Sequence, residues 1–236
     1  MEVNVSDTAS GSLAGISLFA GLDENELTEL EKACSWRRYT SNEQIIDRQS
    51  DSTDVFFVIE GKVRVVNYSL SGREITLDDI VPGRHFGELA AIDGQPRSAS
   101  VMALEESLLA ALPQERFLDV ARRRPEVSYL VMLTLARIIR VSTDRIMDLS
   151  TLAANNRVQA ELLREARSNP VNENTAQISP IPVHGDIASR VSTTRETVAR
   201  VLNDLARQGI VERQKDALVI HDLARLSEMV EEVRGE

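Results

Sequence analysis

The stretch FGELAAIDGQPRSAS, residues 86–100, carries the clearest functional pattern in the chain. It places Glu88 and Arg97 at opposite ends of a short loop, and the middle of that loop, residues 90–92, is too apolar for an ordinary solvated turn. An arginine can clamp phosphate oxygens through parallel hydrogen bonds, and a carboxylate can accept a hydrogen bond from a sugar hydroxyl. A helical turn that begins near Glu88 would also point free backbone N–H groups at the same anion. The pattern predicts a site for a ligand that has both hydroxyls and a phosphate.

The order and spacing of these residues resemble the phosphate-binding cassette of cyclic nucleotide-binding domains. In that cassette Phe-Gly-Glu-Leu is followed, after a short gap, by Arg-Ser or Arg-Ala and then Ala. The resemblance implies that Glu88 takes the ribose 2′-hydroxyl and that Arg97 with Ser98 takes the cyclic phosphate. The full set that it assigns to the nucleotide is Gly87, Glu88, Leu89, Ala90, Arg97, Ser98 and Ala99. The alternative is an ordinary loop with Glu88 and Arg97 on its surface.

Length and composition indicate a globular protein of two domains. A chain of 236 residues is long enough for two ordinary domains, each with its own core. No apolar run approaches the roughly 18 residues that span a bilayer, so we expect no membrane partner. The N-terminal segment MEVNVSDTASGS lacks the basic cluster and the apolar stretch of a secretory signal. We therefore expect a cytoplasmic protein with a flexible tail over residues 1–15.

Charge and cysteine content narrow the function classes further. The formal net charge of −10 argues by itself against nucleic acid as a partner. In the segment 184–215, however, arginine and lysine outnumber the acidic residues, so that segment is locally basic. Cys34 is the only cysteine, which excludes an intrachain disulfide and a cluster held by several cysteines. We expect Cys34 to be a buried thiol, and we expect no metal site at the isolated His85 and His221.

The first half of the chain combines short helices with a β-rich region. Asp23 and Glu26 form a capping box, which predicts a helix of about three turns. Residues 36–112 contain short β-rich runs separated by turn residues, a pattern typical of an antiparallel barrel or sandwich. Pro113 opens a further short helix that ends at residues 122–124. We interpret this arginine run as a solvated corner and assign it no ligand.

A continuous helical pattern runs from Pro125 to about Ala153 and is the longest element that the sequence predicts. A helix of about 29 residues would be roughly 43 Å long, and its apolar stripe is too wide for one small β-domain to cover. A twin helix from a second copy would cover the stripe, so we expect a homodimer. The alternative is a helix that packs only within its own subunit.

Ser142 and Thr143 interrupt the apolar stripe with two hydroxyls. Such hydroxyls either meet a polar ligand edge or bond back to helix carbonyls. The stretch LARIIRVSTDRIMDL, residues 135–149, resembles the dimer helix of the cyclic AMP receptor family, in which two adjacent hydroxyl residues contact the purine. The resemblance implies base recognition by Ser142 and, across the dimer, by Thr143. Ile138 departs from the family pattern, because a basic residue stands there in the relative on which the resemblance rests.

The stretch HGDIASRVSTTRETVARVLNDLARQGIV, residues 184–211, predicts a helix-turn-helix. The first helix covers residues 186–191, and Ser192 and Thr193 form the turn. Thr193 and Glu196 form a capping box for the second helix, which Gly209 stops. Apolar runs on either side of a polar bend, the second of them at residues 217–220, add a wing.

Three charged residues near the start of that second helix are candidates for reading DNA. Arg195, Glu196 and Arg200 lie where a recognition helix meets base edges. The core Arg-Glu-Thr-Val-x-Arg resembles the recognition helix of the same family. The resemblance implies that Arg195 and Arg200 read guanines, that Glu196 reads a cytosine, and that Thr193 and Thr194 also belong to the DNA site. The alternative is a solvated surface of ordinary charges.

The three motifs occur in the order typical of the Crp/Fnr family of transcription regulators. The resemblance implies an α+β fold with an N-terminal antiparallel β-roll that binds a cyclic nucleotide, a long dimerisation helix and a C-terminal winged helix-turn-helix. We expect these parts at residues 16–124, 125–154 and 155–236. The implied ligand is cyclic AMP, with cyclic GMP as the alternative, and the implied partners are a palindromic DNA operator, a second copy and RNA polymerase.

Other function classes fit the sequence less well. A redox or haem sensor of the same architecture would be favoured by a cysteine cluster, and Cys34 is alone. An enzyme acting on cyclic nucleotides would need a nucleophile or grouped metal ligands, so we predict no catalytic residues and no enzyme. A nucleotide-binding regulatory subunit would not need the DNA-reading pattern at residues 195–200. The sequence fits an activator and a repressor equally.

Overall fold

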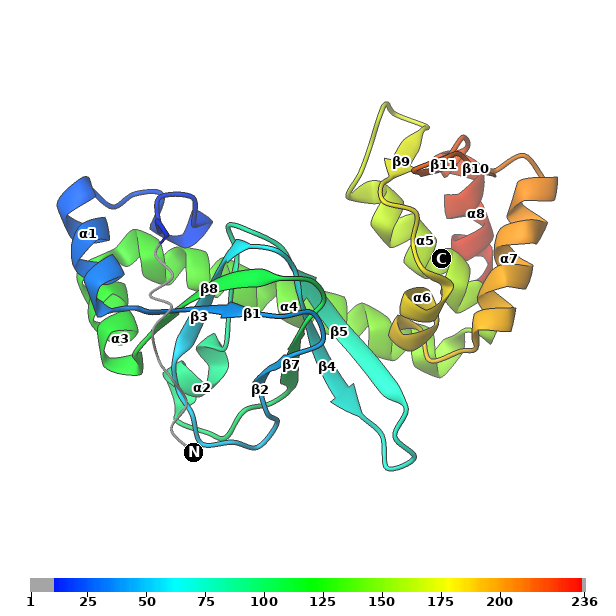
Figure 1. Ribbon diagram of the computed structural model, residues 1–236. Coiled ribbons are helices and arrows are strands. Elements are labelled where there is room, and N and C mark those ends of the chain that lie inside the picture. The colour runs from blue at the N-terminus through cyan, green and yellow to red at the C-terminus, as the bar shows by residue number, and fades with distance from the viewer. Residues whose placement is uncertain (1–10, 235–236) are drawn as a thin grey trace. The chain divides into compact units, whose positions relative to one another are not determined.

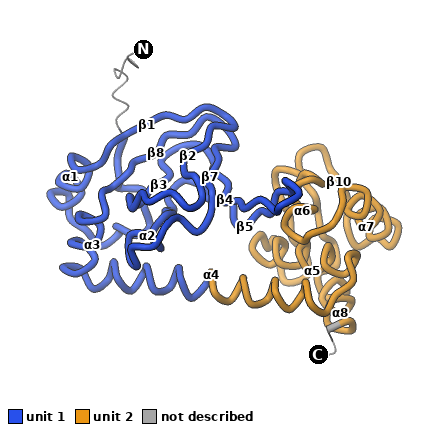
Figure 2. Tube along the Cα trace, turned by 90° about the horizontal axis from the view of Figure 1, so that it is seen from below, with its two compact units in different colours: residues 1–137 blue, residues 138–236 orange. Residues whose placement is uncertain are grey.

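The computed structural model describes residues 11–234, so most of the tail predicted over residues 1–15 lies outside the described residues. Two compact units make up the chain, residues 1–137 and 138–236, and the long helix α4 (Pro125–Thr151) contributes to both (Figure 2). Leu13 is fully buried in the core of the first unit. The predicted tail is therefore too long, because ordered packing already includes Leu13.

The first unit is a β-roll flanked by helices (Figure 1). Its elements are η1 (Ser17–Phe19), α1 (Glu24–Ala33), β1 (Ser35–Tyr39), β2 (Gln44–Ile46), β3 (Val55–Glu60), β4 (Val63–Tyr68), β5 (Glu74–Ile80), β6 (His85–Phe86), α2 (Glu88–Asp93), β7 (Ser100–Ala103), β8 (Ser107–Leu112) and α3 (Gln114–Arg123). The long helix α4 (Pro125–Thr151) follows.

Two antiparallel four-stranded sheets form the roll. Their strand orders are β1-β8-β3-β6 and β2-β7-β4-β5. Neighbouring residues on β3 point to opposite faces, as the period of a strand requires. Phe56 belongs to the core inside the roll, whereas Phe57 packs with the helical elements and with Val127 and Val131 of α4. The antiparallel β-domain predicted for this part of the chain is confirmed.

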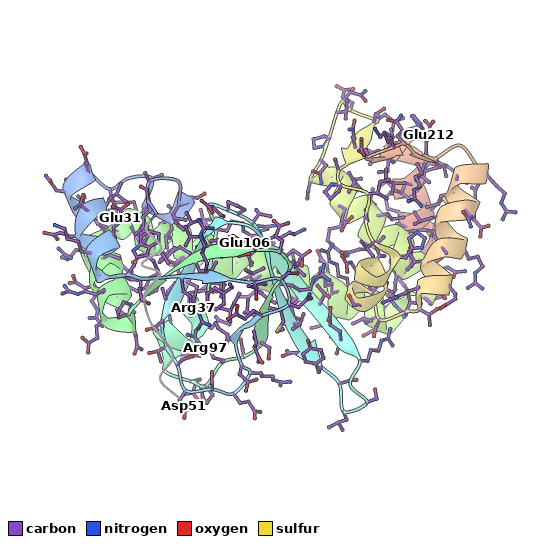
Figure 3. All side chains as sticks on the ribbon, in the orientation of Figure 1. Glu31, Arg37, Asp51, Arg97, Glu106 and Glu212 are labelled. Atoms are coloured by element: carbon purple, nitrogen blue, oxygen red, sulfur yellow. The ribbon has the colours of Figure 1, made fainter. Side chains whose placement is uncertain are left out.

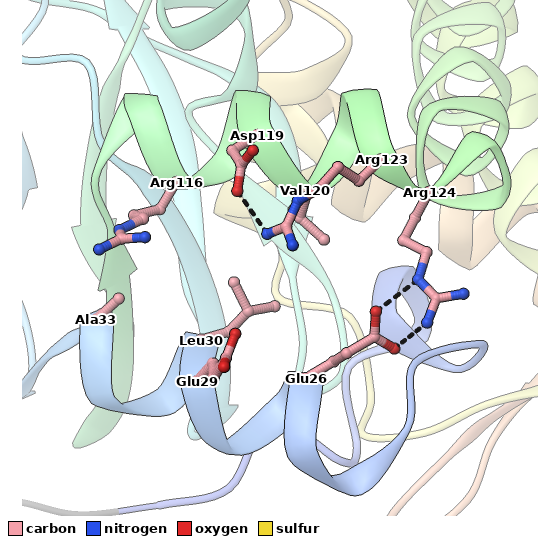
Figure 4. Close-up of a pocket in the computed structure, with 9 residues that line it drawn as sticks. All are labelled: Glu26, Glu29, Leu30, Ala33, Arg116, Asp119, Val120, Arg123 and Arg124. Atoms are coloured by element: carbon pink, nitrogen blue, oxygen red, sulfur yellow. Dashed lines mark hydrogen bonds and ion pairs between the residues drawn. The ribbon is translucent and has the colours of Figure 1, made fainter.

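The capping box predicted for α1 is present and is extended by an ion pair. Asp23 accepts hydrogen bonds from the backbone N–H groups of Asn25 and Glu26, and the Glu26 carboxylate accepts from the Asp23 N–H at 3.0 Å. Glu26 also forms a two-point ion pair with Arg124, beside a polar groove between α1 and α3 (Figure 4). Arg124 therefore helps to hold α1 in place, and the interpretation of residues 122–124 as a solvated corner does not apply to Arg124.

The helix α4 leaves a row of large apolar side chains uncovered. Its first turns are buried against the first unit through Val127 and Val131. Farther along, Met132, Ile139 and Ile146 are 58%, 64% and 63% exposed. An exposed apolar row of this length on one helix is typical of a surface that another chain covers.

The helix predicted from Pro125 to about Ala153 ends at Thr151, and the chain breaks at Leu152 and Ala153. Ala153 is extended, and it precedes α5 (Ala154–Arg167), so Asn155 and Asn156 fall in the first turn of α5. Asparagine is unfavourable inside a helix but is tolerated near the N-terminal end. Sequence reasoning therefore placed the break about two residues too late.

The second unit packs helices around a small sheet. Its remaining elements are β9 (Ala176–Ile178), α6 (His184–Arg190), α7 (Arg195–Arg207), β10 (Val211–Arg213), β11 (Leu218–Ile220) and α8 (Leu223–Arg234). The strand order is β10-β11-β9, and α5, α6, α7 and α8 contribute to one core (Figure 1). The winged helix-turn-helix predicted here is confirmed. The sequence gives no prediction of β9, because a strand of three residues is too short for a periodic signal.

Candidate nucleotide and DNA sites

Gly87 lets the cassette arginine approach the start of α2. This glycine precedes α2 with a left-handed φ of 85°, which favours glycine over other residues. A Cβ atom at this position would lie 2.7 Å from Nη1 of Arg97 and 3.0 Å from the carbonyl oxygen of Asp54. The glycine of the Phe-Gly-Glu-Leu pattern is therefore required by the close packing of Arg97.

Arg97 is 3% exposed and lies within the β-roll (Figure 3). Its Nε donates to Oγ of Ser52 at 3.0 Å, Nη1 donates to the carbonyl oxygen of Gly87 at 2.8 Å, and Nη2 donates to that of Asp54 at 2.7 Å. A guanidinium has five N–H donors, so one further donor on each terminal nitrogen can serve a phosphate. Ser52 and Asp54 orient the arginine, and sequence reasoning missed both.

Glu88 is a buried carboxyl in the first turn of α2, with 5% of its surface exposed. Burial raises the pKa of Glu88, while its own backbone N–H and the guanidinium groups of Arg84 and Arg97 act in the opposite direction. Burial also lowers the pKa of Arg97, against the influence of Asp54 and Glu88. A hydroxyl donor from a ligand would stabilise the charged form of Glu88.

Some of the other cassette residues are buried, and others are exposed to solvent. Ala90 and Ala99 are 3% and 8% exposed, whereas Leu89 and Ser98 face solvent. Beneath the arginine, the ring of Phe56 lies 5.8 Å from the guanidinium carbon of Arg97. The structure thus brings together a glycine turn, a buried carboxyl and an oriented guanidinium above an apolar wall.

Ser142 and Thr143 belong to the second unit, whereas the cassette belongs to the first. Both residues are exposed on α4. Oγ1 of Thr143 donates to the carbonyl oxygen of Ile139 at 2.9 Å, which is the back-bonding common for threonine in helices. Purine recognition by this pair stays a prediction.

The turn of the helix-turn-helix differs from the prediction by one residue. Ser192 takes a left-handed φ of 55°, and Thr194, not Thr193, caps α7. Oγ1 of Thr194 accepts from the backbone N–H of Thr197 at 3.3 Å. Since the third residue after this cap is Thr197, Glu196 is not part of a capping box.

The charged residues predicted to read DNA share one accessible part of α7. Arg195, Glu196 and Arg200 are exposed, while Val198 and Val201 on the same helix are buried. Hydrogen bonds from the backbone of Glu196 and from Thr194 lower the pKa of Glu196, with Arg195 adding to the effect. Glu196 is therefore ready to accept a hydrogen bond as a carboxylate.

Gly185 allows Arg195 to lie against the first helix of the motif. A Cβ atom at position 185 would meet Nε of Arg195 at 3.0 Å and Nη2 at 3.3 Å. Arg200 in turn contacts Oδ1 of Asn155 at 3.3 Å. Both arginines thus extend over neighbouring helices of the second unit.

Arg157 holds the turn that precedes α7. Its guanidinium donates to the carbonyl oxygens of Leu152, Val191 and Ser192 at 2.9, 2.8 and 3.1 Å. One side chain therefore connects the break after α4 with the helix-turn-helix turn. The sequence pattern gives no signal for this role, because the acceptors are backbone carbonyls.

A buried ionic network also positions the DNA-reading motif. Glu161 of α5 is 2% exposed and pairs with Arg164, with Arg145 of α4 at 3.6 Å and with Arg190 of α6 at 3.7 Å. Arg164 also pairs with Asp148 of α4 at 2.8 Å. These contacts join the last turns of α4 to α5 and α6.

Two further findings concern the described residues. Over residues 11–234, no group of three or more histidine, cysteine, aspartate or glutamate side chains is arranged to hold a metal ion. In the same part of the chain, none of the helices combines the length and apolar character of a membrane span.

Two family models match the two parts of the chain that contain these residues. The model of the cyclic nucleotide-binding domain family matches residues 36–124, and that of the Crp-like helix-turn-helix domain family matches residues 156–229. The cyclic AMP receptor protein of Thermus thermophilus is 33% identical over 92% of this chain and 98% of its own length. A CRP-like cAMP-activated global transcriptional regulator of Mycobacterium tuberculosis is 26% identical over 91% of this chain and 96% of its length.

Solved structures show the same architecture. The catabolite activator protein of Thermus thermophilus has a TM-score of 0.52 and 32% identity, and the match covers 92% of this chain and 99% of that protein. A CooA variant from Carboxydothermus hydrogenoformans has a TM-score of 0.79 at 22% identity, covering 95% and 98%, which supports the fold alone. The chain belongs to the Crp/Fnr family of cyclic-nucleotide-binding, DNA-binding transcription regulators, whose members matched here are regulators and not enzymes.

Proposed function

We propose that the protein is a homodimeric transcription regulator whose effector is cyclic AMP and whose target is a palindromic operator. The observation that carries the proposal is the state of Arg97, which is buried and anchored on three protein oxygens while two N–H donors remain for a ligand. A buried guanidinium prepared in this way fits a phosphate anion. The neighbouring Glu88 fits a sugar hydroxyl.

The ligand would be held at three points. Arg97 and Ser98 would bind the cyclic phosphate, Glu88 would accept from the ribose 2′-hydroxyl, and Ser142 with Thr143 would contact the base. Relatives described as a cyclic AMP receptor and as a cAMP-activated regulator support cyclic AMP as the nucleotide. Cyclic GMP has the same phosphate and ribose, so direct titration must separate the two.

Dimerisation would cover the exposed apolar row on α4. Met132, Ile139 and Ile146 are each more than half exposed in the single chain. A parallel pairing with the same helix of a second copy would remove them from water, as in a two-stranded coiled coil. Twofold symmetry would then place one recognition helix at each half of a palindrome, with half-sites about 34 Å apart.

DNA recognition would use the accessible part of α7. Arg195 and Arg200 would donate to guanines, and Glu196 would accept from a cytosine amino group. Thr193 and Thr194, at the turn, would contact the phosphate backbone of the DNA near the N-terminus of α7. A regulator of this kind works in the cytoplasm with RNA polymerase, so we propose that location and that partner for this chain.

Calorimetric titration with cyclic AMP and with cyclic GMP tests the proposed function. We expect one nucleotide per subunit, with cyclic AMP binding more tightly, and a dimer in analytical ultracentrifugation. The Arg122→Ala variant, altered at an exposed arginine, should bind as the parent does. Tighter binding of cyclic GMP would reassign the effector, and binding of neither nucleotide would refute the proposal.

A further inference from the structure

Asn67 on β4 lies beside the cassette but outside its sequence pattern. β4 pairs with β7 so that Val65 lies opposite Val101 and Val66 opposite Ser100. Side chains alternate along a strand, so Asn67 continues the row of Val65 toward the cassette. The side-chain nitrogen of Asn67 donates to the carbonyl oxygen of Ser98 at 3.5 Å.

Asn67 faces the same apolar wall as the cassette arginine. Val65 packs against the core cluster that contains Phe56 and Val101. The guanidinium of Arg97 lies over the ring of Phe56. The β4 row that ends in Asn67 therefore borders the apolar surface above which a ligand on Arg97 would extend.

The amide of Asn67 presents a buried acceptor to this surface. Oδ1 of Asn67 is buried and has no hydrogen-bond partner among the described residues. A buried acceptor without a donor destabilises a protein, so such groups are few and each calls for a reason. The contact of Nδ2 with the Ser98 carbonyl also orients the amide, because reversing it would set two oxygens against each other.

We propose that Oδ1 of Asn67 accepts a hydrogen bond from the exocyclic amino group of the bound purine and that Asn67 determines nucleotide specificity. The proposal rests on the proposed binding of a cyclic nucleotide at Arg97. A purine anchored by its phosphate carries one strong amino donor, at position 6 in adenine and at position 2 in guanine. A purine without that amino group would leave the acceptor of Asn67 unpaired.

A cycle that combines a protein substitution with a ligand substitution tests this contact. Parent and Asn67→Leu are titrated with cyclic AMP and with the cyclic purine nucleotide that lacks the 6-amino group. They are also titrated with cyclic GMP and with cyclic inosine monophosphate, which lacks the 2-amino group. In the parent, one amino-bearing nucleotide should bind roughly 2- to 10-fold more tightly than its counterpart, and in Asn67→Leu that ratio should fall to about one. If the ratio changes for the first pair, Asn67 contacts the 6-amino group of adenine, and if it changes for the second pair, Asn67 contacts the 2-amino group of guanine.

The stability of the nucleotide-free protein separates this role from a structural one. Replacing an unpaired buried acceptor by an apolar side chain of similar size should leave the unfolding temperature unchanged or raise it. A residue kept only for packing would lower it on substitution. Asn25→Leu, at an exposed position on α1, is the matched control and should leave all four affinities unchanged.

Two results would overturn the inference. The first is an equal amino-group preference in the parent and in Asn67→Leu for both nucleotide pairs. The second is a parent that binds the two members of each pair with equal affinity. A parent that binds none of the four nucleotides would overturn the proposed function itself, which is a distinct outcome of the same titrations.

Discussion

The cassette and the recognition helix hold their arginines in opposite ways. Arg97 is 3% exposed, and three of its N–H groups donate to oxygens of the protein. Arg195 and Arg200 are exposed on α7, and the contact described for Arg200 is with the exposed Asn155 at 3.3 Å. A buried arginine that donates hydrogen bonds to protein oxygens stabilises the fold, whatever ligand it also binds. An exposed arginine contributes little to stability.

This difference leads to a general expectation about substitutions. In the cassette, loss of a side chain should reduce both the free energy of unfolding and ligand affinity, because the same atoms serve both. On α7, loss of a charged side chain should reduce DNA affinity and leave stability nearly unchanged, since exposed positions contribute little.

The largest effect should come from Arg97→Ala. Loss of charge-assisted phosphate contacts should weaken nucleotide binding by on the order of 3 kcal/mol, about a hundredfold, and the freed carbonyls of Gly87 and Asp54 should lower stability. Calorimetry and thermal unfolding measure the two quantities. The exposed Arg122→Ala should change neither. An Arg97→Ala variant that binds nucleotide as tightly as the parent would show that the cassette is not the nucleotide site.

Acid should destabilise the first unit through His85. Burial lowers the pKa of His85 to about 4, from an ordinary value near 6.5. Below pH 6.5 the unfolded chain binds a proton that the folded chain excludes, so stability should fall between pH 6.5 and 4, by at most about 3 kcal/mol. Urea unfolding across this range should show a flatter profile for His85→Leu. A pH profile of His85→Leu as steep as that of the parent would contradict the role assigned to His85.

Arg200→Ala should affect DNA recognition alone. We expect a loss of roughly 1 to 3 kcal/mol on the specific operator and relaxed preference at one base pair per half-site, because a bidentate guanine contact discriminates between bases. Fluorescence anisotropy on a panel of operator variants measures both effects. The unfolding temperature should match that of the parent. Uniform weakening on every sequence would make Arg200 a phosphate contact instead.

The smallest effect concerns the cap of α7. Thr194→Ala should lower the free energy of unfolding by about 1 kcal/mol, because it removes an N-cap acceptor. Thr193→Ala, one residue earlier, is the matched control and should cost less. Denaturant titration measures the free energy of unfolding of the two variants. A larger loss of this free energy for Thr193→Ala would support the capping box of Thr193 and Glu196 that the sequence predicts.

Local signals made much of the fold predictable from sequence. The capping box of α1, the β-rich run over residues 36–112 and the helix-turn-helix spacing each depend on neighbouring residues. The error at the start of α7 occurred where two adjacent residues could serve as the same cap. Thr193 and Thr194 are the same residue type, and the structure shows that Thr194 caps α7.

Contacts between distant residues could not be predicted in the same way. Ser52 and Asp54, which orient Arg97, lie 45 and 43 residues away from it along the chain. The ionic partners of Glu161 lie on three helices, and Arg164 alone is at a helical spacing that a sequence pattern can indicate. The cassette motif therefore predicted Glu88 and Arg97 as site residues, whereas the residues that orient Arg97 came from the structure.

The central claim is that a nucleotide on the cassette changes the affinity of α7 for DNA. The most direct measurement is the operator affinity of the parent with and without saturating cyclic AMP, repeated for the variant with Ser142→Ala and Thr143→Val. We predict a 5-fold to 150-fold gain in the parent, the usual range of such coupling, an equal gain in nucleotide affinity on adding operator, and a smaller gain in the variant. Operator affinity that does not respond to nucleotide in the parent would contradict the account.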